Sequence, residues 1–153
     1  MTMTRYEKAV SLFKEGYNCA QAVVGAFEEE IGVEHNLLMS MASSFGGGMG
    51  RLREVCGTVT GAFIVLGAMF GYNDPKATTD KADHYKHIQE FANRFKAENG
   101  SYICRELLGL EEKTSHHVPE ERTEQYYKKR PCAELCGVAA EILEKLILEI
   151  KSE

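Results

Sequence analysis

The residues of this 153-residue chain most suited to catalysis or metal binding are its five cysteines: Cys19, Cys56, Cys104, Cys132 and Cys136. Cysteine thiolates attack disulfides and coordinate metal ions, so a set of this size is open to either chemistry. The chain has no Cys-x-x-Cys pair, the usual signature of a structural zinc site or a thioredoxin-like dithiol. The nearest pair, Cys132 and Cys136, lies four residues apart on one helix face.

Four of the five cysteines are expected in or near the first turn of a helix. Each follows a feature that typically begins one: Cys19 after Asn18, Cys104 after Ser101, Cys132 after Pro131, and Cys56 after a glycine-rich loop. Unpaired backbone N–H groups and the helix dipole stabilise a thiolate there, and so lower the pKa of the thiol. If these helix starts meet at one end of the fold, the four sulfurs converge on one site. Cys136 lies one turn inside its helix and is expected to be a bystander.

A structural role for the cysteines is the alternative interpretation. Cysteine is among the most buried residue types and packs as a small apolar side chain. Five unrelated core cysteines in a helical protein would then carry no chemistry. Spacing along the chain does not decide between a shared site and separate core positions.

Apolar residues recur at helical spacing in nearly every segment that would position these cysteines, and no segment alternates with a period of two. The pattern predicts an all-α fold, a single domain over residues 1–153. We expect a bundle of about five to seven helices around a central uncharged helix. The expected helices cover residues 5–15, 19–31, 36–44, 53–70, 80–99, 102–108 and 131–150.

The uncharged stretch, residues 55–73, has the length of a membrane span, but glycines and threonines dilute its apolar character. We therefore interpret it as a buried central helix and expect no membrane span. The chain as a whole is 44% hydrophobic and 27% charged, with a net charge of -5, which argues against nucleic acid as a partner. The N-terminal residues are charged and lack a signal-peptide pattern, and the cysteine count is odd, so we expect a cytoplasmic location.

A glycine-rich segment, residues 46–50, precedes Cys56 and has two interpretations. It could cradle an anion with backbone N–H groups, although it lacks the Gly-Lys-Ser/Thr ending of a nucleotide-binding loop. A close-packed turn that lets Cys56 approach its neighbours is favoured, because glycine permits tight backbone contact. Arg51 and Arg53 follow directly, and their charges could lower thiol pKa values near Cys56.

The segments that carry these features resemble the C_GCAxxG_C_C family of redox-active proteins. The likeness covers nearly the whole chain and rests on these segments: GYNCAQAV (16–23), FGGGMG (45–50), CGTVTGA (56–62), CRELLG (104–109) and PC (131–132). The chain departs from the family pattern at Thr58, where the family usually has alanine, and Cys136 is additional.

The resemblance implies that the family's four cysteines correspond to Cys19, Cys56, Cys104 and Cys132. It also implies a redox partner or a membrane transporter system as the partner, because family members are often encoded near transporter genes. The sequence leaves open whether the protein forms a homodimer. A similar domain occurs in split-Soret cytochromes, but this chain has no Cys-x-x-Cys-His, so we expect no covalent haem.

Three functions are compatible with these observations. The favoured one is thiol/disulfide exchange or sulfur handling, with Cys19 or Cys56 as the attacking thiolate. In the second, Cys19, Cys56, Cys104 and Cys132 are ligands of zinc or of an iron–sulfur cluster in an electron-transfer protein. In the third, the protein is a helical interaction module whose cysteines only pack. We favour exchange because close cysteine pairs, which usually anchor structural metal sites, are missing.

Overall fold

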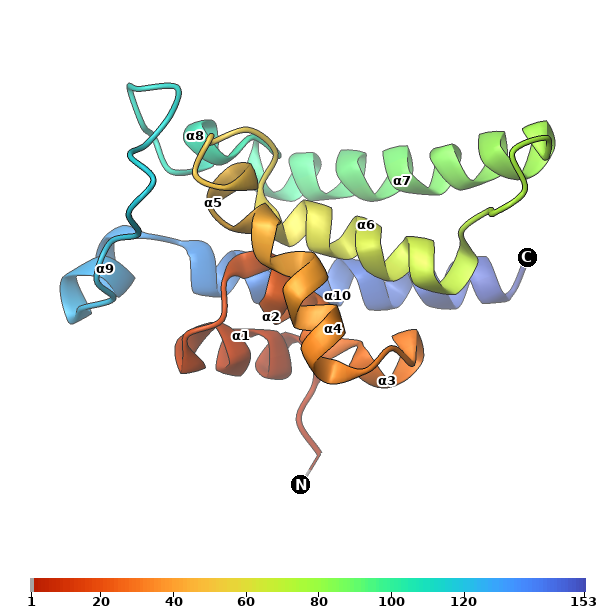
Figure 1. Ribbon diagram of the computed structural model, residues 1–153, viewed down its shortest axis with the longest axis horizontal. Coiled ribbons are helices and arrows are strands. Elements are labelled where there is room, and N and C mark those ends of the chain that lie inside the picture. Colours follow the sequence, from red (N-terminus) through yellow and green to blue (C-terminus); the bar gives the residue numbers. More distant parts are fainter. Residues whose placement is uncertain (1) are drawn as a thin grey trace.

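Three long helices run side by side in the computed structural model of the chain, which describes residues 2–153 (Figure 1). They are α6 (Gly57–Phe70), α7 (Thr78–Asn99) and α10 (Cys132–Lys151), and each contacts the other two. α1 (Arg5–Glu15) packs on α10, and α2 (Cys19–Ala26) packs against α1, α6 and α10. The core therefore lies between α2, α6 and α10, with α1 and α7 covering it.

Shorter helical segments connect these elements: α3 (Glu28–Ile31), α4 (His35–Ala42), the 3₁₀ turn η1 (Ser43–Phe45), α5 (Gly46–Met49), α8 (Cys104–Leu107) and α9 (Glu124–Lys129). The predicted all-α fold is confirmed, since residues 2–153 form no strand and only one isolated bridge, between Val55 and Ile103. The structure divides the expected helix 19–31 at Phe27 and adds the short segments α5 and α9 to the expected set.

Local capping decides where the first helices begin. The Asn18 side chain accepts a hydrogen bond from the Gln21 backbone N–H at 2.9 Å, and the Gln21 side chain accepts one from the Asn18 N–H at 3.0 Å. This reciprocal pair satisfies backbone donors that would otherwise be left unpaired. It makes Cys19 the first residue of α2, as the sequence predicted.

The central helix α6 carries no charged residue, and its first six residues, 57–62, are all buried, as are Val65 and Leu66. Gly57 and Gly61 let α2 approach it closely: a Cβ at Gly57 would lie 3.1 Å from the Cys19 Cβ, and one at Gly61 would lie 2.8 Å from the Ala20 carbonyl oxygen. The predicted buried central helix is therefore confirmed. In the described part of the chain, no helix combines the length and the apolar character needed to cross a membrane.

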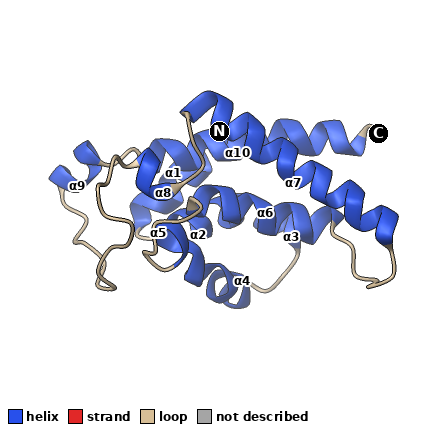
Figure 2. Ribbon diagram, turned by 90° about the horizontal axis from the view of Figure 1, so that it is seen from above, coloured by secondary structure: helices blue, strands red, loops and turns tan. Residues whose placement is uncertain are grey.

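Several helices begin at the same end of the bundle. Seen from above, α6, α7 and α10 again lie side by side, and the long loop between α8 and α9 lies at the end where α10 begins (Figure 2). The starts of α6 and α10 and the short helices α5 and α8 lie at this end as well (Figure 1). This arrangement brings the expected cysteine positions toward one another.

Candidate functional site

A cavity of about 270 Å³ lies at this end of the bundle, and Cys19, Cys56, Cys104 and Cys132 all line it. Three of them are the first residues of α2, α8 and α10, and Cys56 immediately precedes α6. The structure thus brings together the four positions that the sequence singled out. Cys136 lies outside the lining: it is fully buried, and its sulfur lies 3.9 Å from the carbonyl oxygen of Cys19. All five cysteines are free.

Cys19 is half-buried and carries the most acidic thiol of the cavity, with a pKa lowered to about 7. The largest cause is the interaction of its sulfur with the neighbouring Cys132 thiol. The backbone N–H groups of Gly47 and of Cys19 itself and the charge of Arg122 lower the pKa further, while burial opposes them. Cys19 therefore holds more thiolate at neutral pH than an ordinary cysteine does.

Cys132 is the other member of this pair. Donating its proton to Cys19 raises the pKa of the Cys132 thiol far above its ordinary value, and burial and the negative charge of Cys19 raise it further. When Cys19 is ionised, the two sulfurs hold one proton, with Cys132 as the donor and Cys19 as the acceptor. A thiolate beside a protonated thiol supplies an attacking sulfur and a second sulfur that can resolve a mixed disulfide with another molecule.

Cys56 and Cys104 lie on the other side of the cavity and are 5% and 6% exposed. Burial raises the pKa of Cys56 to about 12, although the Thr58 hydroxyl lies 3.1 Å from its sulfur and partly offsets that effect. Burial likewise raises the pKa of Cys104, opposed by Arg53, whose Nη1 donates to the Cys104 sulfur at 3.5 Å.

Two expectations from the sequence need correction here. The expected lowering of thiol pKa values at helix starts holds for Cys19 and is wrong for Cys56, Cys104 and Cys132. Burial outweighs the backbone N–H groups at Cys56 and Cys104, and Cys132 is held protonated by Cys19. Arg53 was expected to lower the pKa of Cys56. Its guanidinium contacts the Cys104 sulfur instead.

The glycine-rich segment forms a left-handed turn, which we call the glycine turn (residues 46–51). The φ angles from Gly47 to Arg51 are 68°, 70°, 71°, 66° and 67°. Such angles are strained for Met49 and Arg51, which have a Cβ. The turn directs the Gly47 N–H to Cys19 and packs Gly48 so tightly that a Cβ there would lie 2.6 Å from the Cys104 Cβ. These contacts support the close-packed turn that the sequence favoured.

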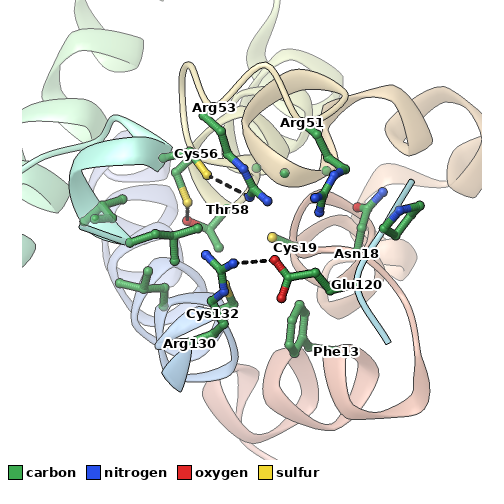
Figure 3. A pocket seen from close by; sticks show the side chains of 18 of the residues that line it. Phe13, Asn18, Cys19, Arg51, Arg53, Cys56, Thr58, Glu120, Arg130 and Cys132 are labelled. Atoms are coloured by element: carbon green, nitrogen blue, oxygen red, sulfur yellow. Dashed lines mark hydrogen bonds and ion pairs between the residues drawn. The ribbon is translucent and has the colours of Figure 1, made fainter. Parts of the chain in front are cut away.

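Four arginines line the cavity: Arg51, Arg53, Arg122 and Arg130. Arg51 and Arg53, from the loop between α5 and α6, and Arg130, just before α10, point toward Cys19 (Figure 3). Arg122 packs over the Phe13 ring, 4.0 Å from its centre, and donates to the carbonyl oxygens of Phe13 and Tyr17. Sequence reasoning identified only Arg51 and Arg53. The nearest signal for the others was the basic run that ends at Arg130, just before Pro131 and Cys132.

The cysteines of the cavity are residues that could bind a metal there. Among residues 2–153, no three His, Cys, Asp or Glu side chains lie close enough together to hold a metal ion. The assignment of Cys19, Cys56, Cys104 and Cys132 as ligands of zinc or an iron–sulfur cluster therefore stays a prediction.

Comparison with known protein families gives one match. The family described as "Putative redox-active protein (C_GCAxxG_C_C)" matches residues 17–146, a range that includes every cysteine of the cavity. The family resemblance that the sequence motifs indicated is confirmed. Comparisons with curated proteins and with solved structures give no match.

Proposed function

The chain belongs to the C_GCAxxG_C_C family of redox-active proteins, and from that premise we propose that it performs thiol–disulfide exchange at the Cys19–Cys132 pair. The observation that carries this proposal is that Cys19 and Cys132, the first residues of α2 and α10, line the same cavity, where interaction with the Cys132 thiol lowers the pKa of Cys19 to about 7. Thiolates are the nucleophiles of disulfide exchange, and the best attacking thiol has a pKa near the ambient pH. Cys19 meets that condition.

The first step joins Cys19 to the substrate. The Cys19 thiolate attacks one sulfur of a substrate disulfide, so that a bond forms between these two sulfurs and the substrate S–S bond breaks. The other substrate sulfur leaves with the electron pair and becomes a thiolate. The product is a mixed disulfide between Cys19 and half of the substrate.

The second step resolves the mixed disulfide. Cys132 gives its proton to the departed substrate thiolate and attacks the Cys19 sulfur, forming a Cys19–Cys132 disulfide and releasing the second half as a thiolate that takes a proton from water. The two protein thiols lose two electrons, and the substrate disulfide gains them. A reduced dithiol partner restores the pair by the reverse exchange.

This assignment narrows the choice of attacking thiol that the sequence left open. With a pKa of about 12, Cys56 holds almost no thiolate at neutral pH, so Cys19 is the nucleophile. We assign no bond-forming step to Cys56, Cys104 or Cys136. A reducing cytoplasmic setting for the exchange stays a prediction. A transporter system as partner and a homodimer stay predictions.

Trapping the mixed disulfide tests the proposal. In Cys132→Ala, an aromatic disulfide that releases a coloured thiol should leave a stable adduct on Cys19, seen as added mass on that peptide. The unaltered protein should release a second thiol and end with a Cys19–Cys132 disulfide.

The Cys19→Ala variant should form neither product, and Cys136→Ala, the matched control, should behave as the unaltered protein does. Adduct formation by Cys19→Ala at the original rate, through Cys56 or Cys104, would overturn the assignment.

A further inference from the structure

Arg53 is a buried cation without a carboxylate partner. Its side chain is 5% exposed, and its guanidinium donates to the Ser115 hydroxyl at 2.8 Å and to the Cys104 sulfur at 3.5 Å. None of the ion pairs within residues 2–153 includes Arg53. A buried charge that lacks an opposite charge costs several kcal/mol of solvation, roughly, so such groups are normally paired.

Cys104 does not supply the missing negative charge. Burial raises the pKa of its thiol above the ordinary value, so the group in contact with Arg53 is neutral at neutral pH. The Ser115 hydroxyl is neutral as well. The Arg53 charge therefore faces the cavity without compensation from its own contacts.

The other charges around the cavity add to this excess. Arg51 and Arg122 form no ion pair within the described chain, and Arg130 pairs with Glu120 at 2.6 Å. Glu120 is the single carboxylate among the described lining residues, against four arginines. The chain as a whole has a net charge of -5, so this positive cluster runs against the overall balance.

The direction of these side chains places the positive charge where a substrate of Cys19 would lie. The guanidinium groups of Arg51 and Arg53 approach from the glycine turn and the residues just after it, and that of Arg130 approaches from the opposite side (Figure 3). Guanidinium groups bind carboxylates through two parallel hydrogen bonds. A cavity of about 270 Å³ accommodates a small molecule.

We infer that the substrate of the cavity is a low-molecular-weight disulfide, or its thiol, that carries a carboxylate group. The carboxylate pairs with Arg53 and Arg51 while the substrate sulfur contacts Cys19. This inference rests on the proposed exchange at Cys19, and it adds the chemical class of the substrate. The positive charge of Arg53 is then paired with a negative charge in the complex and unpaired in the free protein.

A series of disulfides that differ in charge tests the inference through the exchange rate. The series consists of 3,3′-dithiodipropionate, bis(2-hydroxyethyl) disulfide and cystamine, which are anionic, neutral and cationic. At low salt the anionic member should react about tenfold faster than the neutral one, and the cationic member more slowly still. Arg51→Gln should remove most of this preference. Arg94→Gln, the same charge change on α7 at a residue outside the cavity lining, should keep it.

A binding measurement separates this inference from the proposed exchange. Suberate has the chain length of dithiodipropionate but no sulfur, so it should raise the melting temperature of the protein, while neutral 1,8-octanediol should not. Arg51→Gln should remove the shift. Equal exchange rates for all three disulfides, without a suberate shift, would overturn the carboxylate site and leave the exchange standing. Suberate binding without exchange of any disulfide would overturn the exchange and leave the site standing.

Discussion

The two sides of the cavity treat the same side chain in opposite ways. On one side, Cys19 and Cys132 begin α2 and α10, are half-buried, and share a proton that leaves the pKa of Cys19 at about 7. On the other side, Cys56 and Cys104 also lie at helix starts, yet burial raises their pKa values. A helix start is therefore not sufficient for an acidic thiol. Hydrogen-bond donors at the sulfur must also outweigh the loss of water.

The largest effect on stability is expected from Gly48→Ala, which should disrupt the packing on the side of the cavity that holds Cys104. The new Cβ would lie 2.6 Å from the Cys104 Cβ and 2.8 Å from the Arg53 Cα, on a residue whose φ is 70°. Because overpacking and a left-handed alanine each cost free energy, the free energy of unfolding should fall by about 3 kcal/mol. Denaturant unfolding measures this change.

Gly67→Ala is the control for that experiment. Gly67 lies within α6, and no atom lies within 4 Å of the position of an added Cβ. Because alanine loses less backbone entropy in a helix, the substitution should raise the free energy of unfolding by about 0.5–1 kcal/mol. If Gly48→Ala were as well tolerated as Gly67→Ala, the described packing at Cys104 would be wrong.

A smaller effect is expected on the Cys19 side when its hydrogen-bond donor is changed. Cys132→Ala removes the largest cause of the lowered pKa, so the pH at which half of Cys19 is thiolate should rise by about one to two units. Cys132→Ser keeps a donor and should shift the midpoint less. The absorbance of the thiolate as a function of pH measures both. An unchanged midpoint in Cys132→Ala would show that Cys132 does not stabilise the thiolate.

The start of α2 and the burial of the central helix could be predicted because their causes are local, whereas α6 begins at Gly57, four residues after the expected start. Asn18 and Gln21 are three residues apart and cap α2 through their own backbone, which places Cys19 correctly. The uncharged composition of residues 57–70 is enough to predict burial. The end of α2 was less predictable, because the helical pattern continues through Phe27 while the backbone bends there.

The rest of the site depends on contacts that no local pattern reports. Met49 and Arg51 adopt positive φ, which residues with a Cβ rarely do, so the left-handed course of the glycine turn had no signal. Arg122 reaches the carbonyl oxygen of Phe13, 109 residues earlier in the chain. Burial of Cys56 and Cys104 comes from tertiary packing, and it reversed the pKa change expected from their helix starts.

The central claim is that Cys19 is the one acidic thiol of the cavity. Its lowered pKa gives Cys19 more thiolate at pH 7 than an ordinary thiol has. The weaker nucleophilicity of an acidic thiolate offsets only part of this advantage in rate.

Alkylation by iodoacetamide, followed at each cysteine by mass spectrometry from pH 5 to 9, tests this most directly. The account predicts that Cys19 is modified first, with a rate that rises to half its plateau at about pH 7, while Cys56 stays protected throughout. Modification of Cys56 as fast as Cys19, or a Cys19 midpoint near 9, would contradict it.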